Sequence, residues 1–100
     1  MINVYNMRSE RTGKEVPNQF KVICGAGKFE DGTPHEAGCL FQSYDSSIAF
    51  RDIWGKTFLD AEKWDYSRTT GRYRNQFLEE GIAETRKKIA SGEYTLVDMN

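Results

Sequence analysis

The hydrophobic positions in the first two thirds of the chain fall into short runs that turn-forming residues separate. Four of these runs are rich in β-forming side chains and have the length of strands: Gln19–Cys24, Cys39–Tyr44, Ser47–Arg51 and Thr57–Leu59. Glycine, proline and aspartate punctuate the stretches between them. We therefore predict four strands in one antiparallel sheet with an apolar face, the second strand pairing with the third.

The last third of the chain changes to a helical period. Tyr73, Phe77 and Leu78 recur at helical spacing between Gly71 and Glu80, and Thr69 or Thr70 is a credible N-cap. A second helix is predicted over residues 82–90, stopped by Ser91-Gly92, with Glu84 and Lys88 as an i,i+4 ion pair. The predicted fold is α+β, a small antiparallel sheet of about four strands covered by two C-terminal helices.

The two ends of the chain complete the outline. Residues 1–100 form a single domain, in which residues 8–18 are read as a polar loop and residues 1–18 as partly flexible. Tyr94–Val97 returns as an edge strand, and Ile2–Met7 is a second candidate edge. Either edge could pair with its mate across a two-fold axis, so a homodimer is one expected assembly.

Composition and charge restrict the function. The chain is 38% hydrophobic with a net charge of −1, which is typical of a folded protein and lacks the basic excess of a non-specific nucleic-acid binder. It also lacks the acidic excess of a DNA mimic. No apolar stretch approaches the roughly 18–20 residues that span a bilayer, and no signal peptide is visible, so we expect no membrane partner and a cytoplasmic location with reduced thiols.

The start of the first predicted helix is the main candidate site. Backbone N–H groups point outward there, and the helix dipole adds partial positive charge. Arginines at the same end make it attractive for a phosphate or a carboxylate. The candidate anion-binding residues are Arg68, Thr69, Thr70, Arg72 and Gln76.

A plainer reading of the same segment is a capped surface helix whose arginine stems cover apolar surface. Arg72 and Arg74 lie roughly 200° apart on a helix, so at most one of them faces any one pocket.

A second candidate is a surface of interleaved aromatic and basic residues. Tyr44, Arg51, Trp54 and Arg74 could contact a protein partner or stack against a nucleotide or single-stranded nucleic acid. The competing reading is that most aromatic residues of so short a chain are needed in the core.

Cys24, His35 and Cys39 are the only residues that invite metal or nucleophile chemistry. Three ligands are too few for a structural zinc site, and no CxxC pair is present. His35 is the only base for a cysteine nucleophile, and it lies in a segment rich in glycine and proline. No metal, no cofactor and no catalytic residues are therefore predicted, and an enzyme is the least favoured class.

Two segments, Phe41–Ala49 and Trp64–Leu78, carry motifs that occur as a pair. Together they resemble a family of small bacteriophage and prophage proteins of unknown function with the pattern SYxSxIA … YSxTTxxYxxxFL. The likeness covers residues 39–92. The position of Tyr73 is often a histidine in that family, so any chemistry of that histidine is missing from this chain.

The resemblance implies an accessory phage protein in the host bacterial cytoplasm, and it carries over no catalytic residue. We expect a non-enzymatic protein that binds and inhibits or sequesters a host component, either a defence-system protein or a nucleotide signal. The alternative is a nucleic-acid-binding accessory factor that uses the arginine and aromatic surface. Capping and core packing leave Arg68, Arg72 and Gln76 unexplained, and function is expected there.

Overall fold

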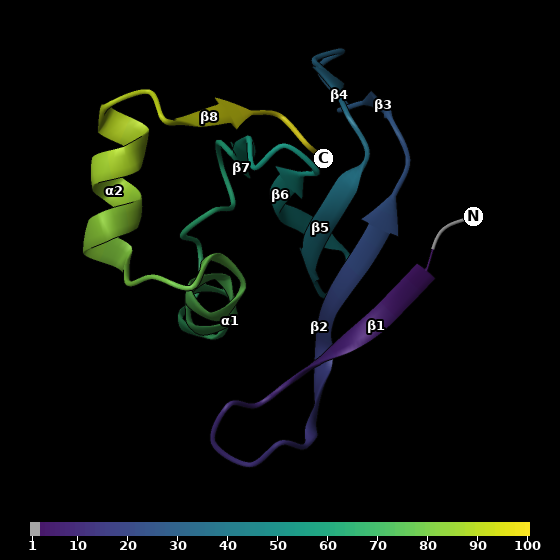
Figure 1. Ribbon diagram of the computed structural model, residues 1–100. Helices are drawn as coiled ribbons and strands as arrows, with labels where there is room; N and C mark the ends of the chain where they lie inside the picture. Colours follow the sequence, from purple (N-terminus) through teal and green to yellow (C-terminus); the bar gives the residue numbers. More distant parts are fainter. Residues whose placement is uncertain (1–2) are drawn as a thin grey trace.

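The structure is a computed structural model that describes residues 3–100 (Figure 1). Its elements follow in the order β1 (Asn3–Arg8), β2 (Glu15–Cys24), β3 (Gly27–Lys28), β4 (Pro34–His35), β5 (Gly38–Ser43), β6 (Ser46–Asp52), β7 (Thr57–Asp60), α1 (Arg68–Leu78), α2 (Ile82–Ala90) and β8 (Tyr94–Val97). Six strands form one sheet in the order β1-β2-β5-β6-β7-β8, and β3 pairs with β4. The α+β class and the two C-terminal helices are as predicted.

The four predicted strands correspond to β2, β5, β6 and β7, and the antiparallel pairing of β5 with β6 is confirmed. The expected count of about four strands is wrong, because the large sheet has six. Residues 8–18 are not one loop either, since β2 begins at Glu15 and pairs with β1. The polar residues of this hairpin show no local strand pattern, and hydrogen bonding between the two backbones forms it. Ile2, part of the predicted edge strand, lies outside the described residues.

The sheet is mixed rather than purely antiparallel. β8 runs parallel to β7, with Thr57 opposite Tyr94 and Asp60 opposite Val97. Between these strands the chain passes through both helices, and such a crossover connection is what parallel neighbours require. Tyr94–Val97 is an edge strand as predicted, and β1 forms the opposite edge.

Both faces of the sheet are covered. On one face, Tyr73 and Leu78 of α1 join a buried cluster with Phe41, Ala49 and Leu59 from the sheet. On the other face, a second cluster consists of Phe50, Phe58, Val97 and Met99, with Phe29 packed against it. The C-terminal tail and the β3–β4 segment thus cover the face that the helices leave free.

Helix α1 begins three residues earlier than predicted. Ser67 is its N-cap, and the Ser67 hydroxyl accepts a hydrogen bond of 3.1 Å from the backbone N–H of Thr70. Thr69 and Thr70 therefore lie inside the first turn instead of capping it. The helix ends at Leu78, followed by Glu79 in a left-handed conformation with φ of 59°, a common way for a helix to stop.

Arg74 is the largest fully buried side chain, with 1% exposure. Its Nη1 donates to the Trp64 carbonyl at 2.7 Å and to an Asp65 carboxylate oxygen at 3.1 Å, and its Nη2 donates to the side chain of Asn75 at 2.9 Å. The guanidinium carbon also lies 5.2 Å from the centre of the Trp64 ring. Arg74 therefore clamps the β7–α1 connection onto the helix and is unavailable to a partner, so its prediction as a partner-surface residue is wrong.

We expect Arg74→Ala to lower the free energy of unfolding by about 3 kcal/mol, because it opens a cavity and leaves the half-buried Trp64 without the donor to its carbonyl. Arg72→Ala, two residues away on the exposed side of the same helix, should change it by less than about 0.5 kcal/mol. Urea unfolding of both variants measures the difference. Equal stabilities of the two would show that Arg74 is no clamp.

Candidate functional site

The N–H groups at the start of α1 are largely used by the protein itself. Ser67 accepts from Thr70 through its hydroxyl and from Gly71 through its carbonyl. Thr70 is wholly buried, and its hydroxyl lies 2.9 Å from that of Ser43 in a side-chain hydrogen bond. Thr70 is therefore a wrong candidate for anion binding, since its side chain and its N–H both have internal partners.

The exposed residues at this helix start instead line a hollow, which we call the arginine hollow. Its volume is about 450 Å³, and it is lined by Val16, Pro17, Asn18, Tyr44, Arg68, Thr69, Arg72 and Tyr73. Three predicted anion-binding residues (Arg68, Thr69 and Arg72) and the predicted partner residue Tyr44 meet here. No acidic side chain is among these lining residues, so the two arginines make the hollow cationic.

The wall of the arginine hollow opposite α1, which includes Asn18 and Tyr44, has an unusual backbone conformation. Asn18 and Tyr44 both have positive φ values, 63° and 55°. Asparagine tolerates this region, whereas it is a genuine outlier for a bulky residue such as tyrosine. The Tyr44 N–H donates to the Asn18 carbonyl at 2.7 Å, and the Gln42 amide donates to the Tyr44 carbonyl at 2.8 Å. These bonds hold the 54% exposed Tyr44 side chain at the rim of the hollow.

A buried amide lies next to this wall in the sequence. Gln19 follows Asn18, pairs with Ser43 in the register and has no exposed surface. Neither its Nε2 nor its Oε1 has a hydrogen-bond partner, which ordinarily costs about 1–3 kcal/mol per group. The region beneath the start of α1 therefore contains polar groups that packing alone does not explain.

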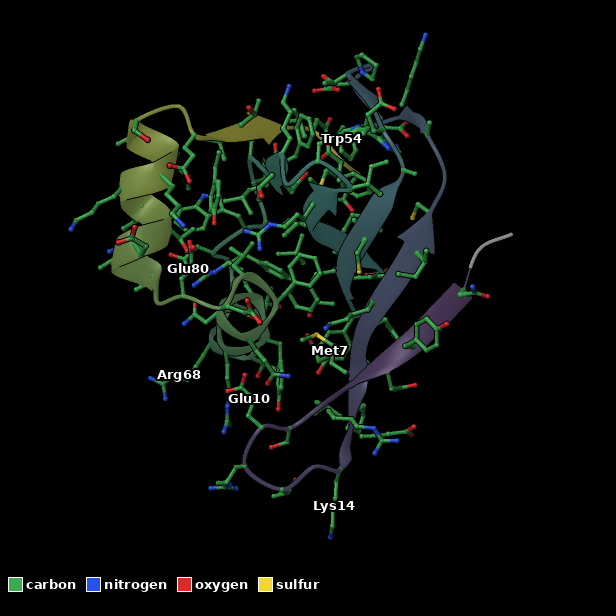
Figure 2. The ribbon with its side chains drawn as sticks, in the orientation of Figure 1. Met7, Glu10, Lys14, Trp54, Arg68 and Glu80 are labelled. Atoms are coloured by element: carbon green, nitrogen blue, oxygen red, sulfur yellow. The ribbon has the colours of Figure 1, made fainter. Side chains whose placement is uncertain are left out.

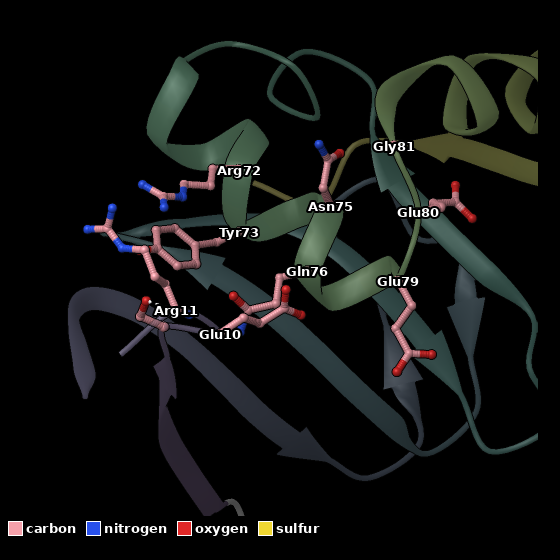
Figure 3. Close-up of a pocket in the computed structure, with 10 residues that line it drawn as sticks. Glu10, Arg11, Arg72, Tyr73, Asn75, Gln76, Glu79, Glu80 and Gly81 are labelled. Atoms are coloured by element: carbon pink, nitrogen blue, oxygen red, sulfur yellow. Dashed lines mark hydrogen bonds between the residues drawn. The ribbon is translucent and has the colours of Figure 1, made fainter. Parts of the chain in front are cut away.

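A second hollow, about 700 Å³ in volume, adjoins the first and is shown in Figure 3. Arg72 and Tyr73 line both hollows. In Figure 3 the side chains of Arg72 and Arg11 extend in the same direction beside the Tyr73 ring. Gln76 also lines this hollow, and its amide donates to the Arg8 carbonyl at 2.6 Å, which ties α1 to the β1–β2 hairpin.

The second hollow differs from the first in its charge. Glu10, Glu79 and Glu80 line it together with the arginines. Sequence reasoning did not identify Arg11, nor the wall of residues 16–18. The only local signal was Pro17-Asn18, a pair typical of a turn.

Glu80 is the centre of a polar network between α1, α2 and β8. Its carboxylate accepts hydrogen bonds from Thr85 at 2.6 Å, from Lys88 at 2.8 Å and from the Tyr94 hydroxyl at 2.8 Å. Lys88 therefore forms its ion pair with Glu80 and not with Glu84, so the predicted Glu84–Lys88 ion pair is wrong. Burial by itself would raise the pKa of Glu80, but the bonds from Lys88, Thr85 and Tyr94 outweigh it and hold that pKa below its ordinary value.

The remaining partner-surface candidates, Arg51 and Trp54, lie outside the arginine hollow. Arg51 is half-buried, and it donates to the Thr57 hydroxyl at 2.9 Å and to the Tyr94 hydroxyl at 3.1 Å. Trp54 is 79% exposed on the β6–β7 turn. Tyr44 precedes β6 and Trp54 follows it, so the two aromatic residues lie at opposite ends of that strand. The four candidates therefore do not form one surface.

The two cysteines lie on different faces of the sheet. Cys39 pairs with Ile23 in the register, whereas Cys24 pairs with Gly38. Burial raises the pKa of both thiols, which makes them poorer nucleophiles. His35 packs between the rings of Phe29 and Phe50, with ring centres 4.6 and 4.7 Å away. Within residues 3–100, no cluster of histidine, cysteine or acidic residues could hold a metal ion.

A substitution of Tyr44 tests whether its ring stabilises the fold by packing or serves only the rim of the arginine hollow. Tyr44→Asn should leave the free energy of unfolding unchanged or raise it by up to about 1 kcal/mol, because asparagine tolerates the left-handed region. Thermal unfolding at equal protein concentration measures the effect. A loss of more than about 1 kcal/mol would show that the Tyr44 ring serves packing, not the rim of a binding site.

The Glu80 network should make stability depend on pH. A carboxyl with a lowered pKa stabilises the fold above its unfolded-state pKa of about 4.3, and this contribution disappears as pH falls through the folded-state value. Glu80→Gln should therefore cost about 1–2 kcal/mol at neutral pH and progressively less in acid. The exposed Glu84→Gln is the control. Parallel pH profiles of the Glu80 variant and the wild type would contradict this account.

Neither helix between residues 3 and 100 has the length and apolar character needed to cross a bilayer.

Comparison with known proteins identifies the family of this chain. No curated protein and no solved structure matches the chain. Residues 3–93 match a family described as "Family of unknown function (DUF8033)". This match covers nearly the whole chain, and the protein therefore belongs to the DUF8033 family.

Proposed function

We propose that this protein is a non-enzymatic binding protein that sequesters a nucleotide in the arginine hollow. The observation that carries the proposal is the convergence of Arg68 and Arg72 with the exposed Tyr44 ring in one cavity that no acidic residue lines. Two guanidinium groups suit a phosphate, for which arginine offers paired N–H donors. An exposed aromatic ring suits the flat face of a base.

The size and the lining of the hollow support a small ligand. A volume of about 450 Å³ lies within the range of small-molecule sites. The adjoining hollow brings Asn75 and Gln76. The Asn75 Oδ1 and the Gln76 Nε2 are engaged with Arg74 and Arg8, which leaves the Asn75 Nδ2 and the Gln76 Oε1 for base edges or ribose hydroxyls. The lining of the arginine hollow offers donors and rings but no carboxylate, imidazole or thiol. Such a set favours binding over chemical turnover.

The bacteriophage resemblance of the two motifs suggests the biological setting. A small protein that holds a host nucleotide would remove a signal from the infected cell without any reaction. The same setting is compatible with inhibition of a host protein. We favour the nucleotide because the arginines and Tyr44 gather in a hollow, whereas Arg51, Trp54 and Arg74 are dispersed or buried.

The test is calorimetric titration of the protein with AMP, GMP, CMP, UMP, ATP and GTP, with the matching nucleosides and inorganic phosphate alongside. We expect at least one nucleotide to bind at least tenfold more tightly than its nucleoside, because the phosphate contacts the arginines. Arg68→Ala/Arg72→Ala should weaken binding by about a hundredfold or more, as expected for two lost charge-assisted hydrogen bonds.

The control removes the same charge elsewhere. Lys28 and Lys87 are exposed residues outside the arginine hollow, and Lys28→Ala/Lys87→Ala should keep nucleotide affinity within about twofold. Equal losses in both double variants would indicate non-specific attraction and overturn the site. Binding of single-stranded oligonucleotides alone, with a steep dependence on salt, would replace the proposal with a nucleic-acid function.

A further inference from the structure

We propose that β1 joins two copies of this chain by antiparallel pairing with itself. β1 is an edge of the large sheet, and no strand among residues 3–100 pairs with its outer side. Figure 1 shows β1 on the side of the sheet away from α2 and β8. An edge strand presents a row of unpaired N–H and C=O groups, which another strand can satisfy.

The first four residues of β1 lack the features that usually prevent such pairing, whereas Arg8 and the ladder irregularity lie at the other end of the strand. Proteins protect edges with charged side chains, proline, bulges or short strands. Residues 3–6 of β1 carry no charge and no proline, and the irregularity of its ladder comes only after Asn6. Val4 and Tyr5 are 59% and 55% exposed, and they point to opposite faces because they are neighbours in a strand. Each face of the edge thus presents one exposed apolar side chain beside an asparagine.

The opposite edge is less suited to pairing. β8 is short, with four residues, and the charged residues Glu93 and Asp98 flank it. Asp98 and Asn100 are also engaged within the chain, since the Asp98 N–H donates to Asp31 and the Asn100 side chain donates to Ser47. The tail that follows β8 is therefore tied to the protein's own loops.

The occupant is a second copy because β1 is complementary to itself. A two-fold axis perpendicular to the sheet makes the paired strands antiparallel and keeps both helix-bearing faces on one side. A centre at Tyr5 then sets Val4 opposite Asn6 of the second copy, so the pairing stays within the uncharged residues 3–6. A centre at Asn6 would run across the ladder irregularity between Asn6 and Arg8.

The rest of the molecule supports this pairing. The second half of β1 is anchored to its own hairpin, because the Asn6 amide donates to the Val16 carbonyl and Arg8 donates to the Gly13 carbonyl. The edge is therefore already ordered before it meets a partner, which reduces the entropy lost on binding. A net charge of −1 adds little repulsion between two copies.

The test is the molar mass of the full chain in solution, measured by light scattering after size-exclusion chromatography from low to high micromolar concentration. The wild type should approach twice the monomer mass as concentration rises. Val4→Lys/Tyr5→Lys should stay monomeric, with the dissociation constant of the dimer raised at least tenfold. The reason is that position 5 of each copy then carries a like charge, and these charges face each other across the axis. Both residues are largely exposed, so circular dichroism should show an unchanged fold.

The matched control places the same charges on the other edge. Thr95→Lys/Leu96→Lys changes two exposed residues of β8 and should leave the dimer intact. A wild type that is monomeric throughout the concentration range would overturn the proposal. So would a dimer that the β8 variant disrupts while the β1 variant preserves it.

Discussion

The burial of Arg74 is the constraint on which the helical half of the structure depends. A guanidinium with 1% exposure is tolerated because the Trp64 carbonyl, Asp65 and Asn75 accept from its two terminal nitrogens, although its Nε has no partner. These bonds fix the rotation of α1 about its own axis. At the start of the same helix, the Arg68 side chain extends outward from the protein (Figure 2). Because Arg72 lies roughly 200° away on the helix, burial of Arg74 turns Arg72 outward. The clamp thereby positions the cationic wall of the arginine hollow.

The opposite wall of the hollow is held by strain. Asn18 and Tyr44, which line this wall, are two of the three non-glycine residues with positive φ among residues 3–100. Such conformations cost about 1–3 kcal/mol and persist where the surroundings impose them, often at functional sites. Here the β2–β5 pairing and the Tyr44–Asn18 hydrogen bond impose them. A rigid clamp on one side and a strained turn on the other make the cavity pre-organised.

Local patterns located the regular elements well. Alternating or β-rich runs predicted β2, β5, β6 and β7, and helical spacing predicted both helices, because each signal is contained within one element. The helix period also showed that Arg72 and Arg74 could not share a pocket. The polar hairpin gave no such signal, so Arg8 at the end of β1 and the first residues of β2 were read as loop, whereas the rest of β1 was predicted as the candidate edge strand Ile2–Met7. The candidate site was predicted in part. Arg68, Thr69 and Arg72 line the arginine hollow as predicted, whereas Thr70 is buried. Asn18 and Arg11, which line the two hollows, were not predicted from the sequence.

The sequence by itself determined the α+β class, the two helices and the cluster of arginines near the first helix, because propensity and periodicity act over a few neighbouring residues. Only the tertiary structure decided which arginine is buried, that Lys88 binds Glu80, and that Tyr44 meets Arg68 across the hollow. It also decided that β8 runs parallel to β7 and that β1 pairs with β2. These outcomes depend on pairing and burial between segments far apart in the chain, and such contacts outweigh local preference.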